Sequence, residues 1–106
     1  MEQGKRIDSL LELLKSESND VFLNYVLGIE YASIGKMEEA KVQFVKVLIL
    51  DENYIPVYYQ IGKLFEKAND VTAAIDYYKK GAQKCKEQKN TKSLSEFEEA
   101  IFLLED

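Results

Sequence analysis

The chain has 106 residues, enough for one compact domain, and its 46% apolar and 31% charged residues are typical of an ordinary folded protein. Its 14 basic and 19 acidic residues give a net charge of -5, which argues against a nucleic-acid binder, because such a protein needs positive charge to displace counterions from phosphates. With no histidine and one cysteine, the chain has no His-based metal site, no Ser-His-Asp triad, no Cys-His dyad and no internal disulfide.

One proline and five glycines favour long helices over an all-β or loop-rich fold. The spacing of apolar residues predicts six helices, at about 5–17, 21–34, 37–50, 54–68, 71–88 and 92–105. The longest apolar run, 100–104, is too short for a signal peptide or a membrane span. We therefore expect a cytoplasmic protein that does not contact a membrane.

The first predicted helix is amphipathic, with Ile7, Leu10, Leu11 and Leu14 on one side and polar residues on the other. Its leucines lie 34 residues before apolar positions of the third helix, so segment 5–20 matches the second half of a helical hairpin. We expect this half-repeat to cap the exposed side of the unit that follows it.

Segments 21–54 and 55–88 form an internal repeat of 34 residues. Leu27, Gly28 and Tyr31 share one helical face, and Ala40 and Phe44 share a face of the next helix. The corresponding residues of the second segment are Ile61, Gly62, Phe65, Ala74 and Tyr78. Glycine and alanine allow two helices to approach closely and the aromatic rings fill the space beside them, so we expect these ten residues to pack each repeat.

This order of Leu-Gly, Tyr, Ala and Phe resembles the tetratricopeptide repeat (TPR), and the resemblance covers residues 21–88. It implies an all-α fold, a right-handed superhelix of antiparallel helix hairpins with about six helices. It also implies one domain over residues 1–106, with an N-terminal cap at 5–20, repeats at 21–54 and 55–88, and a C-terminal capping helix at 91–106. Asn24 and Tyr58 occupy the position of the consensus tryptophan, so the repeats are divergent.

The last segment departs from the 34-residue spacing. Ser93 and Glu96 have the spacing of a capping box, which predicts the start of a terminal helix there. Six lysines between residues 79 and 92 precede an acidic segment, so we expect the fifth helix to pair with the acidic cap, an acidic partner being the alternative. Cys85 continues an apolar stripe and is expected to be a buried core residue rather than a redox sensor.

In the TPR proteins that the chain resembles, the first helix of each hairpin lines a concave groove. The outward positions of these helices are Phe22, Tyr25, Ile29, Tyr59, Lys63 and Glu66. We expect this strip to bind a peptide or a partner helix, unless the end helices cover part of it. A clamp for a C-terminal carboxylate is not expected, because Tyr25, Ile29 and Gln60 stand where that subclass carries lysine and asparagine.

The sequence therefore predicts a non-catalytic protein-interaction scaffold without a metal or a cofactor, whose partner is a protein or peptide rather than nucleic acid or membrane. Paired acids such as Glu98 and Glu99 point in different directions on a helix and make no catalytic dyad. One alternative is a structural homo-oligomer, such as a homodimer, that buries the aromatic groove or the end helix against a second copy. The other is a small enzyme, for which no catalytic residue can be named.

Overall fold

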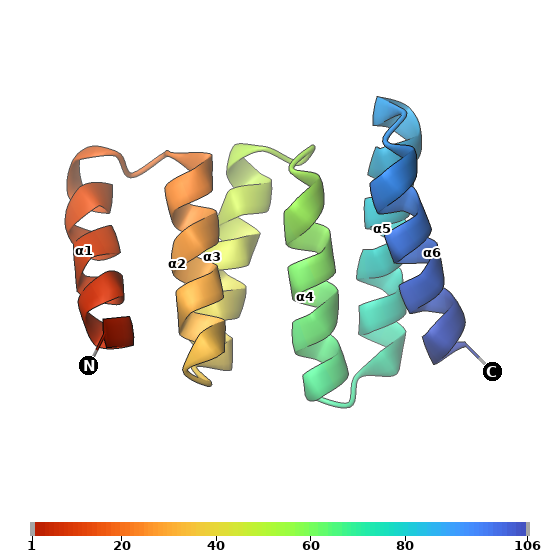
Figure 1. The fold of residues 1–106 in the computed structure, drawn as a ribbon, viewed down its shortest axis with the longest axis horizontal. Coiled ribbons are helices and arrows are strands. Elements are labelled where there is room, and N and C mark those ends of the chain that lie inside the picture. Colours follow the sequence, from red (N-terminus) through yellow and green to blue (C-terminus); the bar gives the residue numbers. More distant parts are fainter. Residues whose placement is uncertain (1, 106) are drawn as a thin grey trace. The chain divides into compact units, whose positions relative to one another are not determined.

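The computed structural model describes residues 2–105, which form six α-helices joined by short turns (Figure 1). The helices are α1 (Glu2–Ser16), α2 (Val21–Ser33), α3 (Met37–Leu50), α4 (Ile55–Lys67), α5 (Val71–Gln88) and α6 (Thr91–Leu104). The predicted all-α fold of antiparallel helix hairpins is confirmed. Met1 and Asp106, the two ends of the predicted domain, lie outside the described residues.

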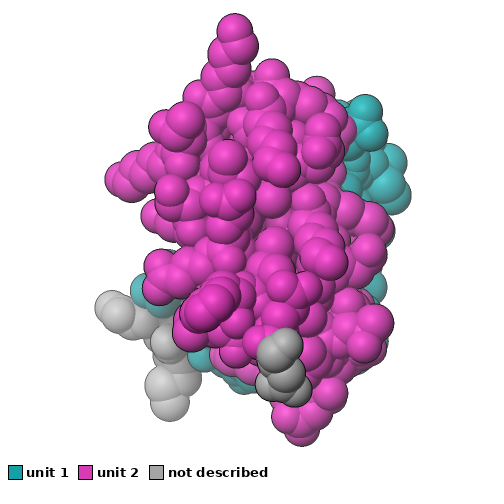
Figure 2. Space-filling model, turned by 90° about the vertical axis from the view of Figure 1, so that its right-hand side faces the viewer, with its two compact units in different colours: residues 1–52 teal, residues 53–106 magenta. Residues whose placement is uncertain are grey.

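The chain divides into two compact units, unit 1 (residues 1–52) and unit 2 (residues 53–106), which Figure 2 colours teal and magenta. In unit 1, α2 packs against α1 and α3, and in unit 2, α5 packs against α4 and α6. The division lies close to the boundary between segments 21–54 and 55–88. The assignment of all residues to a single domain stays a prediction.

The same backbone turn closes the α2–α3, α4–α5 and α5–α6 hairpins. Its left-handed residue is Gly35 (φ 81°), Asn69 (φ 62°) or Lys89 (φ 58°). In all three turns the next residue donates its backbone N–H to the carbonyl five positions earlier, at 2.9 Å. This bond satisfies a carbonyl that the end of the helix would leave without a partner. The turn after α5 therefore repeats the geometry of the turns inside the two predicted repeats.

Side-chain caps begin the helices that follow three of the connections. The carboxylate of Asp20 accepts from Leu23 N at 2.8 Å, and that of Asp70 accepts from Ala73 N at 3.1 Å. At the start of α6, Asn90 Oδ1 accepts from Ser93 N at 3.1 Å. The predicted capping box at Ser93 is therefore wrong, because Asn90 already occupies the capping position and places Ser93 inside the first turn.

In each of the α2–α3, α4–α5 and α5–α6 hairpins, a glycine of the first helix packs against an aromatic ring of the second. The pairs are Gly28–Phe44, Gly62–Tyr78 and Gly81–Phe97, and in each the ring follows its glycine by 16 positions. A Cβ atom added to any of the three glycines would lie within 3.0 Å of three ring carbons, so no larger residue fits without moving the ring. The third pair joins α5 to α6, and it gives the terminal helix the packing of a repeat helix.

The N-terminal helix is attached to α2 by a narrower contact. Ile7 is buried, Leu10 and Leu14 are half-buried, and Leu11, which the sequence placed in the same stripe, is exposed. Arg6 Nε donates to Glu30 Oε1 at 2.9 Å and so links α1 to α2. The face of α1 that packs on α2 is therefore narrow, with one apolar residue in each turn, and Leu11 lies outside this face.

Candidate functional site

A pocket of about 340 Å³ lies in unit 2, where α4 and α6 form its walls. Its lining residues are Tyr59, Lys63, Glu66, Glu96, Glu99, Ala100, Leu103 and Leu104. The first three are spaced by about one helical turn and so share one face of α4. The other five share one face of α6, and the two faces together line the pocket. The pocket thus contains the three groove residues that the sequence predicted on α4, and it adds α6 as a second wall.

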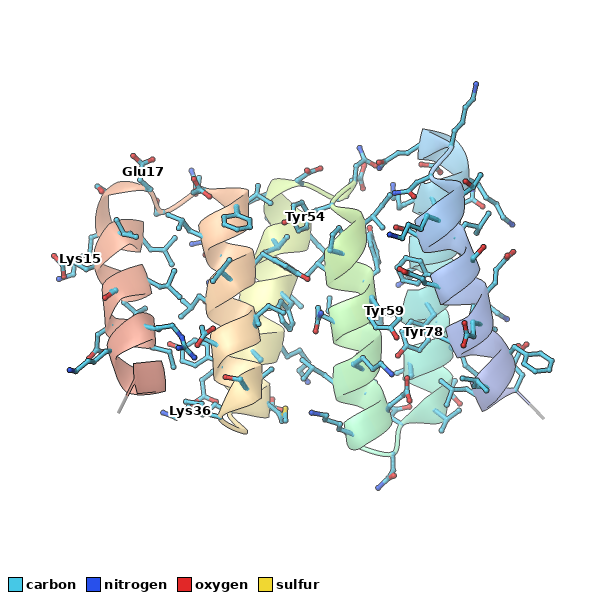
Figure 3. All side chains as sticks on the ribbon, viewed as in Figure 1. Lys15, Glu17, Lys36, Tyr54, Tyr59 and Tyr78 are labelled. Carbon is cyan, nitrogen blue, oxygen red and sulfur yellow. The ribbon has the colours of Figure 1, made fainter. Side chains whose placement is uncertain are left out.

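Tyr59 lines this pocket and is half-buried. Its ring centroid is 5.5 Å from that of Tyr78 and 5.9 Å from that of Phe97, so helices α4, α5 and α6 each contribute one ring to an aromatic cluster. Figure 3 shows Tyr59 and Tyr78 close together between α4 and α5. Because part of the Tyr59 ring is used in this packing, a ligand can contact only its remaining surface.

The carboxylate of Glu66 is oriented by a hydrogen bond from the buried phenol of Tyr78. The Tyr78 hydroxyl donates a hydrogen bond to Glu66 Oε2, and burial together with this carboxylate raises the pKa of Tyr78 far above its usual value. Lys63 Nζ lies 3.8 Å from Glu66 Oε2 and 5.3 Å from the centroid of the Tyr59 ring. The α4 wall therefore presents an oriented carboxylate beside an ammonium group that is already partly neutralised.

The α6 wall supplies carboxylates and aliphatic side chains. Glu96 and Glu99 are exposed at the rim, and Leu103 is exposed beyond them. The sequence analysis predicts only a capping role for this helix, although the spacing of Gly81 and Phe97 equals that of Gly28 and Phe44. That spacing was the signal that could have identified α6 as a packed helix able to line the groove.

The predicted groove residues of unit 1 lie on α2 and differ in their accessibility. Phe22 is 61% exposed, whereas Tyr25 and Ile29 are half-buried. The Tyr25 ring packs on Phe44, with 5.9 Å between centroids, just as Tyr59 packs on Tyr78. On α2, Phe22 is therefore the residue with the most surface to offer a ligand.

The residues predicted to pack the repeats fall into two groups. Tyr31 and Phe65 are half-buried, and Phe65 stacks on Tyr77 with 5.6 Å between ring centroids. The other eight are buried: Leu27, Gly28, Ala40, Phe44, Ile61, Gly62, Ala74 and Tyr78. Tyr31 near the end of α2 and Phe65 near the end of α4 thus lie at the edge of the core.

Three lysines of α5 form ion pairs, and its cysteine is buried. Lys79 Nζ lies 3.6 Å from Glu105 next to α6, whereas Lys80 and Lys84 pair with acids of α5 itself, at 3.1 and 3.7 Å. Cys85 is buried, and burial raises the pKa of its thiol, which makes it a poor nucleophile. Among these ion pairs, that of Lys79 joins α5 to the acidic C-terminal segment, as the sequence predicts, and the other two lie within α5.

Comparisons with known proteins point to one family. A sequence model described as tetratricopeptide repeat matches residues 55–83. A tetratricopeptide repeat domain protein from Salinibacter ruber is 31% identical, with 81% of this chain and 87% of that chain covered and a TM-score of 0.77. No curated protein sequence matches significantly.

Two further structures share the fold at lower identity. The TPR2B domain of yeast Sti1, solved as a complex with pHsp70, is 16% identical, with coverage of 97% and 82% and a TM-score of 0.88. The type III secretion translocator chaperone SycD of Yersinia enterocolitica is 8% identical, with coverage of 97% and 72% and a TM-score of 0.87. Among the helices of residues 2–105, none has both the length and the apolar composition needed to cross a bilayer.

Proposed function

The chain belongs to the tetratricopeptide repeat family, and we propose that it is a non-catalytic interaction module of the cytoplasm that binds a peptide segment or a partner helix. The proposed binding surface is the pocket between α4 and α6 of unit 2. The observation that supports it is a lining that combines Tyr59 with aliphatic side chains and a rim of carboxylates. Such a surface suits a segment that offers both an apolar and a polar side chain.

The charges of the pocket favour a basic ligand. Glu66, Glu96 and Glu99 supply three carboxylates, and Lys63 is the one cation among the lining residues. Lys63 lies 3.8 Å from Glu66 and offsets the charge of that carboxylate. Glu96 and Glu99 therefore leave a negative electrostatic field at the rim. We infer that the ligand carries lysine or arginine next to an aliphatic residue, which would contact Leu103 and Leu104.

The α4 wall of the pocket is rigid before a ligand arrives. The Tyr78 hydroxyl fixes the Glu66 carboxylate, and the Tyr59 ring is held between two other rings. A preorganised surface loses less conformational entropy on binding, which favours affinity. A C-terminal carboxylate would be repelled by the glutamates of the pocket, which argues against a peptide bound here through its C-terminus.

The test is a selection of random twelve-residue peptides on the purified chain, followed by fluorescence anisotropy with the enriched peptides. We expect enrichment of lysine or arginine beside leucine or isoleucine. The double variant Glu96→Lys, Glu99→Lys should weaken binding at least about tenfold, because two rim charges are reversed. These side chains are exposed, so the variant should fold like the wild type.

The matched control is Glu12→Lys, Glu17→Lys, which makes the same change of net charge at exposed positions of α1 and the turn after it. This control should bind the peptides as tightly as the wild type. Equal binding by the two double variants and the wild type would exclude the α4–α6 pocket as the site. Enrichment of acidic peptides would contradict the proposed charge of the ligand.

The α2 face of unit 1 is proposed as a second contact surface, with Phe22, Tyr25 and Ile29 as its residues. Phe22→Ser is the informative variant, because this ring is 61% exposed and its removal leaves the packing of Tyr25 on Phe44 intact. A loss of peptide affinity of about threefold or more would support this surface. Unchanged affinity would restrict the site to unit 2.

A further inference from the structure

Helix α3 carries an apolar stripe on its exposed side. Val42, Val45 and Ile49 recur at three and four residues, and Val42 and Ile49 are 66% and 79% exposed. Together with Lys41 and Lys46 they line a shallow hollow of about 360 Å³. A surface helix normally turns its polar side outward, so an apolar face with a basic border indicates a contact surface.

Helix α6 carries the complementary feature near its end. Phe102 and Leu103 are 77% and 72% exposed and adjacent in the chain. Glu98 and Glu99 precede them by one turn and are exposed on the same side of the helix. This second surface is therefore apolar with an acidic border.

We propose that the α6 surface of one copy of this chain docks on the α3 stripe of a second copy. The apolar residues would cover one another, and Glu98 and Glu99 would approach Lys41 and Lys46, which supply the opposite charge. Lys41 lies 3.7 Å from Glu38 of its own helix, so it would exchange one carboxylate for another rather than leave an uncompensated charge. Charge complementarity thus selects a second copy as the occupant.

The contact joins two different surfaces, so it differs from a symmetric dimer. An open assembly of any length keeps one free α3 stripe at one end and one free α6 surface at the other, so growth is open-ended unless a ring closes. The two surfaces are small, which places the association among transient contacts, with a Kd between about 1 µM and 1 mM. The α3 stripe is independent of the proposed peptide pocket, whereas Glu99 and Leu103 of the α6 surface also line that pocket.

The first experiment measures the weight-average mass by sedimentation equilibrium from about 10 µM to 1 mM. The wild type should rise past the mass of two chains without a plateau, and about 0.5 M salt should reduce the association because it screens the charged border. Ile49→Glu and Phe102→Glu should each remain monomeric to at least tenfold higher concentration. Val71→Glu, at another exposed apolar position, is the control and should associate like the wild type.

The second experiment mixes the two defective variants. Ile49→Glu keeps its α6 surface and Phe102→Glu keeps its α3 stripe, so the mixture can form one contact and should stop at two chains. Circular dichroism of each variant checks that the helices are retained. A wild type that stays monomeric to 1 mM assigns the stripe to another occupant and overturns the proposal. Variants that associate normally, or a mixture that stays monomeric, overturn it as well.

Discussion

The two units use the same hairpin geometry but stabilise it by different chemistry. In unit 1, the buried Asn24 donates to the carbonyls of Ser18 and Asp20 at 3.0 and 2.8 Å, and its Oδ1 accepts from Gln43 Nε2 at 2.6 Å. In unit 2, the equivalent position is Tyr58, an aromatic residue that is also buried. A satisfied amide network and an aromatic side chain thus occupy the same place in the repeat, which shows that the backbone does not prescribe the chemistry of this position.

The units also differ in how their outer helices are attached. Helix α6 is joined to α5 by the Gly81–Phe97 pair and shares the aromatic cluster of Tyr59. Gly4 of α1 has no atom within 4 Å of an added Cβ, and α1 rests on α2 through aliphatic residues and the Arg6–Glu30 pair. The packing of α6 on α5 brings Phe97 beside Tyr59 and gives the candidate pocket its second helical wall.

The largest effect is expected at the glycine–aromatic contact. Gly62→Leu should lower the free energy of unfolding by about 3 kcal/mol, because the new side chain would occupy the space of the Tyr78 ring. Urea denaturation followed by circular dichroism measures it. Gly4→Leu is the control and should be close to neutral, since nothing lies within 4 Å of its added Cβ. Similar stability of the two variants would contradict the packing role of Gly62.

The amide network of unit 1 should give the next largest effect. Asn24→Leu removes three hydrogen bonds and leaves the Gln43 amide without its acceptor, so we expect a loss of about 2 kcal/mol. The double variant Asn24→Leu, Gln43→Leu should lose less than the sum of the two single variants, because each breaks the same bond. Strict additivity in urea denaturation would show that this bond does not couple α2 to α3.

A pH dependence should distinguish the buried phenol of unit 2. The pKa of Tyr78 is raised in the folded protein by burial and by its bond to Glu66, so the unfolded chain loses this proton first. Stability should therefore fall as pH rises above about 10, with Tyr78 contributing up to about 1.4 kcal/mol per pH unit. The variant Tyr78→Phe has no phenolic proton at this position, so its stability should lack this part of the pH dependence. Identical slopes for the wild type and Tyr78→Phe between pH 9 and 11 would contradict the assignment.

The smallest effect is expected in the α5–α6 turn. Lys89 has a φ of 58°, a left-handed conformation that glycine adopts without a Cβ clash. Lys89→Gly should raise the free energy of unfolding by about 0.5 kcal/mol. Thermal unfolding of this variant beside Asn69→Gly measures the effect, and the gain should be smaller at Asn69 because asparagine tolerates this conformation better than lysine. A loss of stability at Lys89 would indicate that its side chain contributes more than its backbone strain costs.

Much of the fold could be predicted because it depends on local spacing. The helix lengths follow from apolar residues at three and four positions, and the close contacts follow from Gly28 and Gly62 at the same place in two repeats. The groove residues of α4 follow from the same spacing, because they are the positions that packing within the repeat leaves outward. The assignment of Phe22, Tyr25 and Ile29 to a binding surface stays a prediction.

The rest depended on contacts between residues distant in the sequence. Nothing in the pattern around Ser93 showed that Asn90 would cap α6 instead, since both residues are good caps and the turn geometry selects between them. The left-handed turn at Lys89 was equally hidden, because lysine has no preference for that conformation. The sequence also did not predict that α6 would line a pocket together with Tyr59 of α4.

By itself, the sequence determined which segments are helices and which of their faces are apolar, because these properties depend on residues a few positions apart. The tertiary structure decided that Glu66 is oriented by Tyr78, that α6 completes a pocket with α4, and that Val42 and Ile49 remain uncovered. Each of these depends on which side chains other helices bring within contact distance. Periodicity along one helix carries no information on that distance.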